Sequence, residues 1–311
     1  NNRAFQTRIW VVDNSTSMKK ADGHRIVDTA NRNYVKIVSS TRWEEIRECV
    51  SYHIHMAGLL RTPTRFRLLN NPGASVGPQE FGIAEIVESI PDDEHKAMAI
   101  MHGAHPRGCT PLTYHIQEIH MIVSSMADEL RREGRKVAIV IATDGLPTNE
   151  HGVGGSHVSQ QFVESLRMLE GLPVWVVIRL CTDEDHIVNF YNELDEHLEL
   201  SLEVLDDFCG EAAEVYEHNP WLNYALPLHR CREMGYHHRV FDLIDERKLT
   251  TTELREFMEL LFGEDNFDGV PDPAVDWMGF SHTIEKLMRQ EKPQWNPMSK
   301  ILTPWIDMRK L

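Results

Sequence analysis

The run of residues 137–143, VAIVIAT, constrains the fold of this chain more than any other segment. It carries no charge and is rich in β-branched residues, which predicts a buried strand near the centre of a sheet. Asp144 and Gly145 follow directly, and the glycine permits a sharp exit from the strand. A strand of this kind needs other strands beside it and helices over both faces of its sheet.

The first two thirds of the chain can supply these neighbours, because short β-branched runs alternate there with amphipathic segments. Six strands are predicted, the third of them at a sheet edge: 8–12, 50–56, 65–69, 137–143, 173–180 and 202–205. The predicted helices cover residues 23–39, 80–89, 93–102, 112–132, 157–170, 184–197 and 211–218. The predicted fold class is α/β, a doubly wound, mostly parallel, Rossmann-like six-stranded sheet flanked by helices.

The composition changes near residue 219. Strand-like runs disappear, and tryptophans occur with many prolines: Trp221, Trp277, Trp295 and Trp305. Thr250 and Glu253 have the spacing of a helical capping box, and Asp272-Pro273 predicts the start of a helix that runs to about residue 290. We therefore expect two domains, residues 5–218 around the sheet and residues 219–311 as a mainly helical extension, whose tryptophans pack within the same molecule.

Charge limits the classes of partner. The chain has 311 residues, of which 32 are Lys or Arg and 48 are Asp or Glu, so its formal net charge is −16. Such a charge repels phosphate backbones and anionic membrane surfaces, which excludes nucleic acid as the main partner. No membrane span is expected either, because the most apolar stretch, residues 137–142, is far shorter than the roughly 20 residues that a span needs.

The cysteines indicate the redox compartment. There are five of them, widely separated and without a Cys-x-x-Cys pair: Cys49, Cys109, Cys181, Cys209 and Cys231. An odd, scattered set predicts neither a disulfide framework nor a zinc knuckle. A reducing compartment, the cytoplasm, is therefore expected.

Three loops carry polar side chains to the predicted carboxyl ends of strands. Asp13, Ser15 and Ser17 form an Asp-x-Ser-x-Ser loop directly after the first strand, and Asp144 follows the strand 137–143. Thr110 lies in the turn Gly-Cys-Thr-Pro-Leu before a long predicted helix. Ligands of open α/β sheets bind at the carboxyl ends of strands, and hydroxyl and carboxylate oxygens are ligands that hard cations prefer. Together the loops predict a divalent metal site.

At these motifs the sequence resembles the von Willebrand factor A family, whose metal-ion-dependent adhesion site combines an Asp-x-Ser-x-Ser loop, a distant Thr and an Asp in a Thr-Asp-Gly setting. Asp13, Ser15, Ser17, Thr110 and Asp144 occupy these positions in the family's order. The resemblance covers about residues 5–218. Cys109 before Thr110 departs from the family's usual turn but leaves the hydroxyl in place.

The resemblance implies a non-enzymatic, metal-dependent protein-binding module. Ser15, Ser17 and Thr110 would coordinate the ion directly, and Asp13 and Asp144 directly or through water. Mg²⁺ is expected, with Mn²⁺ and Ca²⁺ also compatible. A partner protein would supply a Glu or Asp carboxylate as the last ligand, because neutral hydroxyl ligands leave the ion much of its positive charge.

Three alternatives remain at this level. A metal-dependent hydrolase would need a base, and His151, seven residues after Asp144, is the candidate that the sequence offers. An architectural subunit of a larger intracellular complex would use the same fold. A zinc site at His53 and His55, predicted on one face of the strand 50–56, is less favoured because alternate strand residues always share a face.

Overall fold

The computed structural model describes residues 5–28, 35–182 and 184–311. It divides into two compact units. The first unit consists of residues up to 26, 37–207 and 233–235, and the second of residues 27–36, 208–232 and 236–311. The predicted boundary at residue 218 stays a prediction, because compactness does not show which part folds on its own.

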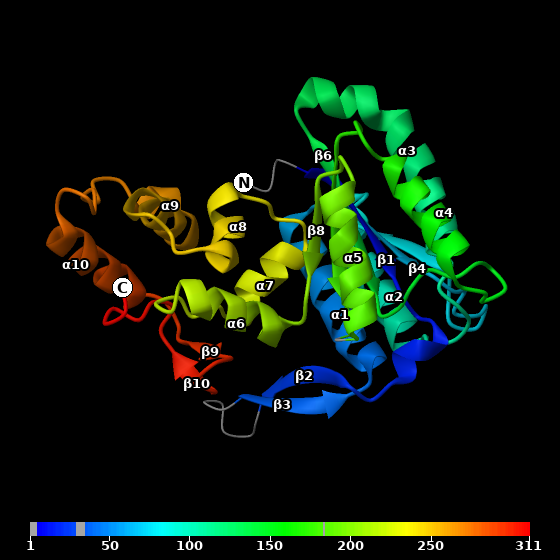
Figure 1. Ribbon diagram of the computed structural model, residues 1–311, viewed down its shortest axis with the longest axis horizontal. Helices are drawn as coiled ribbons and strands as arrows, with labels where there is room; N and C mark the ends of the chain where they lie inside the picture. The colour runs from blue at the N-terminus through cyan, green and yellow to red at the C-terminus, as the bar shows by residue number, and fades with distance from the viewer. Residues whose placement is uncertain (1–4, 29–34, 183) are drawn as a thin grey trace. The chain divides into compact units, whose positions relative to one another are not determined.

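A six-stranded sheet forms the centre of the first unit (Figure 1). The strands lie in the order β5 (Glu80–Ile83), β4 (Thr64–Leu68), β1 (Phe5–Val12), β6 (Lys136–Thr143), β7 (Val174–Leu180) and β8 (Leu202–Leu205). All neighbours are parallel except β4 and β5. The carboxyl ends of β1 and β6 are adjacent, at the point where the strand order changes direction, and open α/β sheets bind ligands at such points.

Helices cover both faces of this sheet, which confirms the doubly wound architecture (Figure 1). One face packs against α3 (Leu112–Glu133), α4 (Ser156–Arg167) and α5 (Asp185–His197). The other packs against α1 (Arg42–Leu60) and α2 (Ile90–Gly103). Strand β6 serves both cores, since Ile139 and Ile141 lie in the first and Val140 and Ala142 in the second. Its uncharged sequence follows from this double burial.

The prediction is wrong for two segments near the amino terminus. Residues 23–39 were expected to form a helix, but the chain forms the two-stranded sheet of β2 (Gly23–Asp28) and β3 (Val35–Ser40). Residues 50–56 were expected to form a strand, but they lie within α1. The local signal for α1 is a capping box in which Thr41 accepts a hydrogen bond from the Glu44 amide and Glu44 accepts one from the Thr41 amide. That cap starts a helix through a segment whose β-branched residues favour a strand.

The prediction also fails at the edge of the sheet. Residues 80–89 were expected to be helical, but they contain β5 and the short 3-10 helix η3 (Val87–Ser89). Because β5 pairs with β4, the strand predicted at residues 65–69 is not an edge strand. The antiparallel partner contains Gly82 and is buried only at Ile83, so its sequence offers little of the apolar pattern that predicts a strand.

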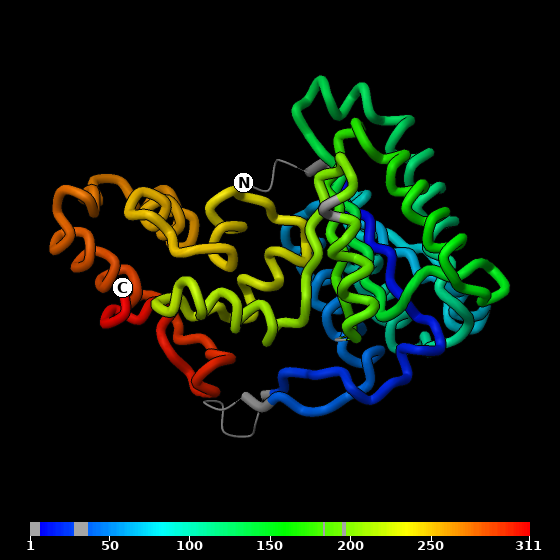
Figure 2. The backbone as a smooth tube through the Cα atoms, in the orientation of Figure 1, coloured from blue at the N-terminus to red at the C-terminus, as the bar shows by residue number. Residues whose placement is uncertain are grey.

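The second unit is mainly helical. Its elements are α6 (Phe208–His218), α7 (Leu226–Glu233, whose last residue belongs to the first unit), α8 (Arg239–Glu246), α9 (Thr251–Phe262), η4 (Glu264–Asn266), α10 (Trp277–Met288), β9 (Gln294–Asn296) and β10 (Ile301–Thr303). Figure 2 shows the carboxyl-terminal segment returning to α6, where the Lys310 ammonium donates to the Tyr216 hydroxyl at 3.0 Å.

Of two helix starts predicted in this unit, one is confirmed and one is wrong. The predicted capping box of Thr250 and Glu253 is confirmed at the start of α9. The predicted helix start at Asp272-Pro273 is wrong, because α10 begins at Trp277 and Asp276 caps it by accepting from the Gly279 amide at 2.8 Å. Within the described residues, no helix is both long and apolar enough to cross a membrane.

Candidate metal-binding site

The Asp-x-Ser-x-Ser loop leaves the carboxyl end of β1 and leads into the 3-10 helix η2 (Thr16–Lys19). The Asp13 amide still donates to the carbonyl of Ala142 at 2.8 Å, so the loop begins beside the end of β6. The Asp13 carboxylate then turns back and accepts from the Ser15 amide at 2.7 Å. This local bond orients the carboxylate toward the neighbouring strand end.

Side chains from the two strand ends meet there. The Thr143 hydroxyl donates to Asp13 Oδ2 at 2.7 Å, and the Ser17 hydroxyl donates to Asp144 Oδ1 at 2.7 Å. The Ser15 and Ser17 hydroxyl oxygens are 2.9 Å apart. The structure therefore brings four of the five predicted site residues into one hydrogen-bonded group.

The loop that carries Thr110 is bonded to both other loops. The Gly108 carbonyl accepts from the amide and the hydroxyl of Thr16, at 3.2 and 3.0 Å. Thr110 itself exchanges hydrogen bonds with Thr148, four residues after Asp144. Gly108 has a φ of +76°, and a Cβ there would lie 2.2 Å from Asn70 Oδ1, so both the turn and the close packing require glycine.

Burial dominates the electrostatics of the two carboxyls. Burial, together with the charge of Asp144, raises the pKa of Asp13 to about 6, although hydrogen bonds from Thr143 and Ser15 oppose the shift. Burial also raises the pKa of Asp144, against hydrogen bonds from Ser17 and Arg42. A nearby cation favours the ionised form of both buried carboxyls and would oppose these shifts.

Sequence reasoning missed one residue of this site, Arg42. Its guanidinium Nη1 donates to Asp144 Oδ2 at 3.0 Å, and its other nitrogens donate to Asp22 at 2.6 and 2.7 Å and to Glu184 at 2.9 Å. The capping box could have placed the start of α1 at Arg42. No pattern in the sequence links residue 42 to residue 144, which the fold alone brings together.

The donor set can be tested against a hard divalent cation. All five predicted ligands offer oxygen, the element that Mg²⁺, Mn²⁺ and Ca²⁺ prefer in proteins. Adjacent oxygens around an octahedral Mg²⁺ with bonds of about 2.1 Å lie about 3.0 Å apart. The Ser15–Ser17 and Ser17–Asp144 oxygen separations of 2.9 and 2.7 Å are close to this value. These residues therefore fit the metal that the resemblance implies.

A second cluster contains potential metal ligands. Cys49, His53 and Glu233 offer ligand atoms that all lie within 4.8 Å of one another, and all three residues are buried. The prediction that His53 and His55 share one face of a strand is wrong because the segment is helical, and His55 contacts Glu94 at 3.5 Å on the surface. Glu233 accepts from Arg179 at 3.4 Å as well as contacting His53 at 3.1 Å. A guanidinium in this position opposes a second cation, so we interpret the group as a buried ionic cluster.

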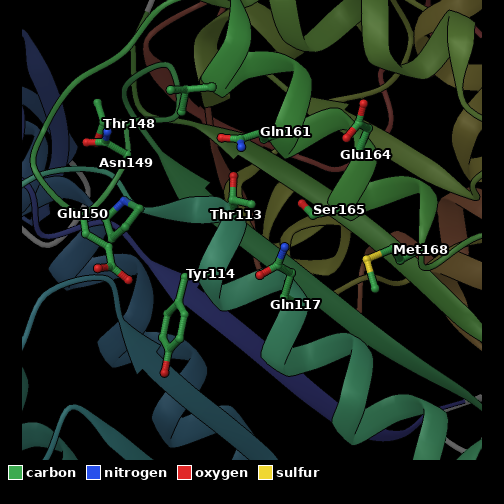
Figure 3. Close-up of a pocket in the computed structure, with 12 residues that line it drawn as sticks. Thr113, Tyr114, Gln117, Thr148, Asn149, Glu150, Gln161, Glu164, Ser165 and Met168 are labelled. Atoms are coloured by element: carbon green, nitrogen blue, oxygen red, sulfur yellow. The ribbon is translucent and has the colours of Figure 1, made fainter.

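A pocket of about 510 Å³ adjoins the Thr110 loop, between α3 and α4 (Figure 3). Gln117 of α3 and Gln161 of α4 face one another across it, and Thr148 lies at its end toward the loop. Glu150 and Glu164 also line it, and none of its lining residues is basic. The pocket therefore has both polar and apolar walls and carries negative charge.

No protein-family model matches this sequence, and no curated protein is significantly similar to it. Among solved structures, the VWA domain of SpRpn10 matches at a TM-score of 0.38 and 11% identity, over 65% of this chain and 88% of that one. The pilus adhesin SpaC from Lactobacillus rhamnosus GG matches in two forms, at TM-scores of 0.41 and 0.39 and identities of 10% and 12%. Each of these matches covers 65% of this chain but only 28% of the adhesin. The matches include a domain of the family that the motifs resemble, at a similarity too low to bear on function.

Proposed function

We propose that this chain is a protein-binding module that holds a divalent cation, Mg²⁺ first among the hard ions, between Asp13, Ser15, Ser17, Thr110 and Asp144. The ion would take a Glu or Asp carboxylate from a partner protein as its last ligand. The observation that carries the proposal is the meeting of hydroxyl and carboxylate oxygens from the ends of β1 and β6, at 2.7 to 2.9 Å.

The role of each proposed ligand follows from its chemistry. Serine and threonine hydroxyls are neutral ligands, so they position an ion without cancelling its charge. Asp13 is held by the Ser15 amide and the Thr143 hydroxyl, which fixes its orientation before any ion arrives. When bound, the ion would supply positive charge between the side chains of the three loops. A partner's carboxylate is the protein group that best complements such a charge.

The surroundings of the site support a protein as partner. The pocket beside Thr110 has room for side chains that flank the carboxylate, and Thr148 links its wall to the Thr110 loop. The proposal of a reducing compartment rests on the sequence, in which five cysteines are scattered without a pairing pattern. We therefore propose a cytoplasmic partner.

The test joins metal binding to partner capture. Mg²⁺ and Mn²⁺ affinities are measured by calorimetry for the wild type, Asp13→Ala and Asp128→Ala, the last a matched control because the Asp128 side chain is 97% exposed. Each protein is then used to capture partners from extract with Mg²⁺ or with EDTA. We expect the wild type and Asp128→Ala to bind the ion and to capture the same protein only with Mg²⁺.

Two results would contradict the proposal. One is a wild type that binds no divalent ion; the other is capture that persists in EDTA and in Asp13→Ala while circular dichroism shows an intact fold. Hydrolysis of a phosphate ester by the metal-loaded protein, lost in His151→Ala, would favour the hydrolase instead.

A further inference from the structure

The side chain of Arg42 is almost completely buried, with 1% of its surface exposed, and it contacts three carboxylates. Two of these, Asp22 and Glu184, have side chains that are 55% and 34% exposed. The third, Asp144, is fully buried and accepts from Arg42 Nη1 at 3.0 Å. Water can therefore solvate the first two carboxylates without Arg42, but it cannot solvate Asp144.

This contact places a permanent positive charge against a proposed metal ligand. Burial disfavours the charge of Arg42, but hydrogen bonds to Asp22, Glu184 and Asp144 outweigh it and raise the pKa further above its usual range. The guanidinium thus stays ionised at every pH at which the protein is folded. Arg42 Nη1 also donates to the backbone carbonyl of Asp144 at 3.4 Å, which holds the arginine beside the end of β6.

The formal charges show what this arginine does to a bound ion. Asp13 and Asp144 together would neutralise a divalent cation and leave the site with no net charge to offer a partner. The Arg42 guanidinium adds one positive charge, so the buried groups and the ion together carry a charge of about +1. Asp22 and Glu184, which also pair with Arg42, are 55% and 34% exposed, and water screens their charges. The same charge lowers the affinity of the site for the ion, because the guanidinium partly neutralises the Asp144 carboxylate before the ion binds.

We infer that Arg42 tunes the proposed metal site, weakening its affinity for the divalent ion and strengthening the attraction of the bound ion for a carboxylate. This inference rests on the proposed function and makes Arg42 a positioning residue rather than a ligand. Anchoring the amino terminus of α1 is the purely structural role that Arg42 would otherwise have. The two roles predict opposite changes in metal affinity.

The experiment compares Mn²⁺ binding by four proteins: the wild type, Arg42→Gln, Arg42→Lys and Arg25→Gln. Arg25 is the matched control, since it pairs with Glu48 at 2.6 Å on the surface and does not contact the site. Calorimetry gives the Mn²⁺ affinity. Titration of the Mn²⁺-loaded proteins with acetate, followed by water-proton relaxation, gives the affinity of the bound ion for a carboxylate.

We expect Arg42→Gln to bind Mn²⁺ roughly ten- to a hundredfold more tightly and acetate at least several-fold more weakly than the wild type. Arg42→Lys, which keeps the charge, should stay within about threefold of the wild type for both, as should Arg25→Gln. Unchanged or weaker Mn²⁺ binding by Arg42→Gln would overturn the inference, since a structural anchor can only damage the site when removed.

A second variant keeps the test decisive if Arg42→Gln does not fold. Asp22→Asn with Glu184→Gln changes two side chains that are 55% and 34% exposed, and leaves Asp144 as the only carboxylate among the described residues that Arg42 contacts. We expect this double variant to bind Mn²⁺ several-fold more weakly, and equal or tighter binding would contradict the inference. A wild type that binds no Mn²⁺ would refute the proposed function itself, whereas a metal-binding wild type with an indifferent Arg42 would refute the inference alone.

Discussion

The first unit contains two ionic clusters that look alike in composition and differ in setting. The site cluster joins Asp13, Asp144 and Arg42; the sealed cluster joins Arg179 to Glu45 and Glu233, beside His53. The residues of the site cluster are buried where loops leave the sheet, and Ser17, which donates to Asp144, is only partly buried. In the sealed cluster Arg179 is 3% exposed and Glu233 is fully buried.

The clusters therefore differ in the exposure of the carboxylates that pair with each arginine: Asp22 and Glu184 are 55% and 34% exposed, whereas Glu45 and Glu233 are 15% and 0% exposed. Burial disfavours the charge of Arg179, but the neighbouring Glu45 and Glu233 carboxylates outweigh it and raise its pKa. The sealed cluster thus compensates its charges with its own side chains, out of reach of any ion. The site cluster has the Ser15 and Ser17 hydroxyls beside its carboxylates, and Ser17 is only partly buried, so we propose that an external cation completes it.

The largest effect should come from breaking the sealed cluster. Arg179→Met leaves the Glu45 and Glu233 carboxylates without their buried counter-charge, and we expect it to lower the free energy of unfolding by about 3–5 kcal/mol. Urea denaturation at pH 7 measures the change, with Arg25→Gln as a surface control expected to lose less than about 1 kcal/mol. A loss below about 1 kcal/mol in Arg179→Met would show that the two clusters do not differ as described.

In the site cluster, removing a charged residue should not destabilise the protein. Without metal, Asp13→Asn removes one of two close buried carboxylates, and we expect stability to change by less than about 1 kcal/mol or to increase. With Mg²⁺ at about a hundred times its dissociation constant, the wild type should gain about 2.7 kcal/mol and the variant none. Urea denaturation with Mg²⁺ and with EDTA tests both statements. Equal stabilisation of variant and wild type by Mg²⁺ would show that the ion does not bind at Asp13, and the proposed difference between the two clusters would be wrong.

His115 is a buried ionisable group outside both clusters, and its titration allows a test by pH. Burial lowers the pKa of His115 to about 4, although its hydrogen bond to the Leu69 carbonyl opposes the shift. The unfolded chain, with a pKa near 6.5, takes up a proton first as the pH falls. Stability is therefore unaffected above pH 6.5 and should fall between pH 6.5 and 4, by about 2 kcal/mol at pH 5.

Comparison with a variant isolates this contribution from other groups. In His115→Gln the loss of unfolding free energy between pH 7 and pH 5 should be smaller than in the wild type by about 2 kcal/mol. Urea denaturation at the two pH values gives the difference. The same pH dependence in both proteins would mean that His115 does not titrate as its burial requires.

The smallest expected change in stability comes from removing either capping box, and the two variants should differ only in Mn²⁺ affinity. Thr41→Ala and Thr250→Ala each remove the hydrogen bond that caps a helix, α1 or α9, and each should lower stability by about 1 kcal/mol. Only Thr41→Ala should also alter Mn²⁺ affinity, because Thr41 precedes Arg42. Thermal unfolding and calorimetry measure the pair, and a change in Mn²⁺ affinity in Thr250→Ala would contradict the link between α1 and the site.

The predictions from sequence succeeded where one signal dominated. Residues 137–143, 173–180 and 202–205 were predicted as strands and lie in β6, β7 and β8, because an uncharged or alternating run of the right length favours a strand on its own. The exchange of helix and strand between residues 23 and 60 shows the opposite case. There the apolar spacing fits either structure, and the Thr41 capping box and the pairing of β2 with β3 decided the outcome.

The sequence by itself determined the sheet's central strand, the α/β class and the five oxygen-bearing residues of the candidate site, because each depends on residues close together in the chain. Only the tertiary structure decided that Arg42 lies against Asp144, that Thr148 holds Thr110, and that Glu233 reaches the cluster of Arg179. These contacts join residues 38 to 102 positions apart. Charge pairing acts through space, so it leaves no pattern in a single sequence.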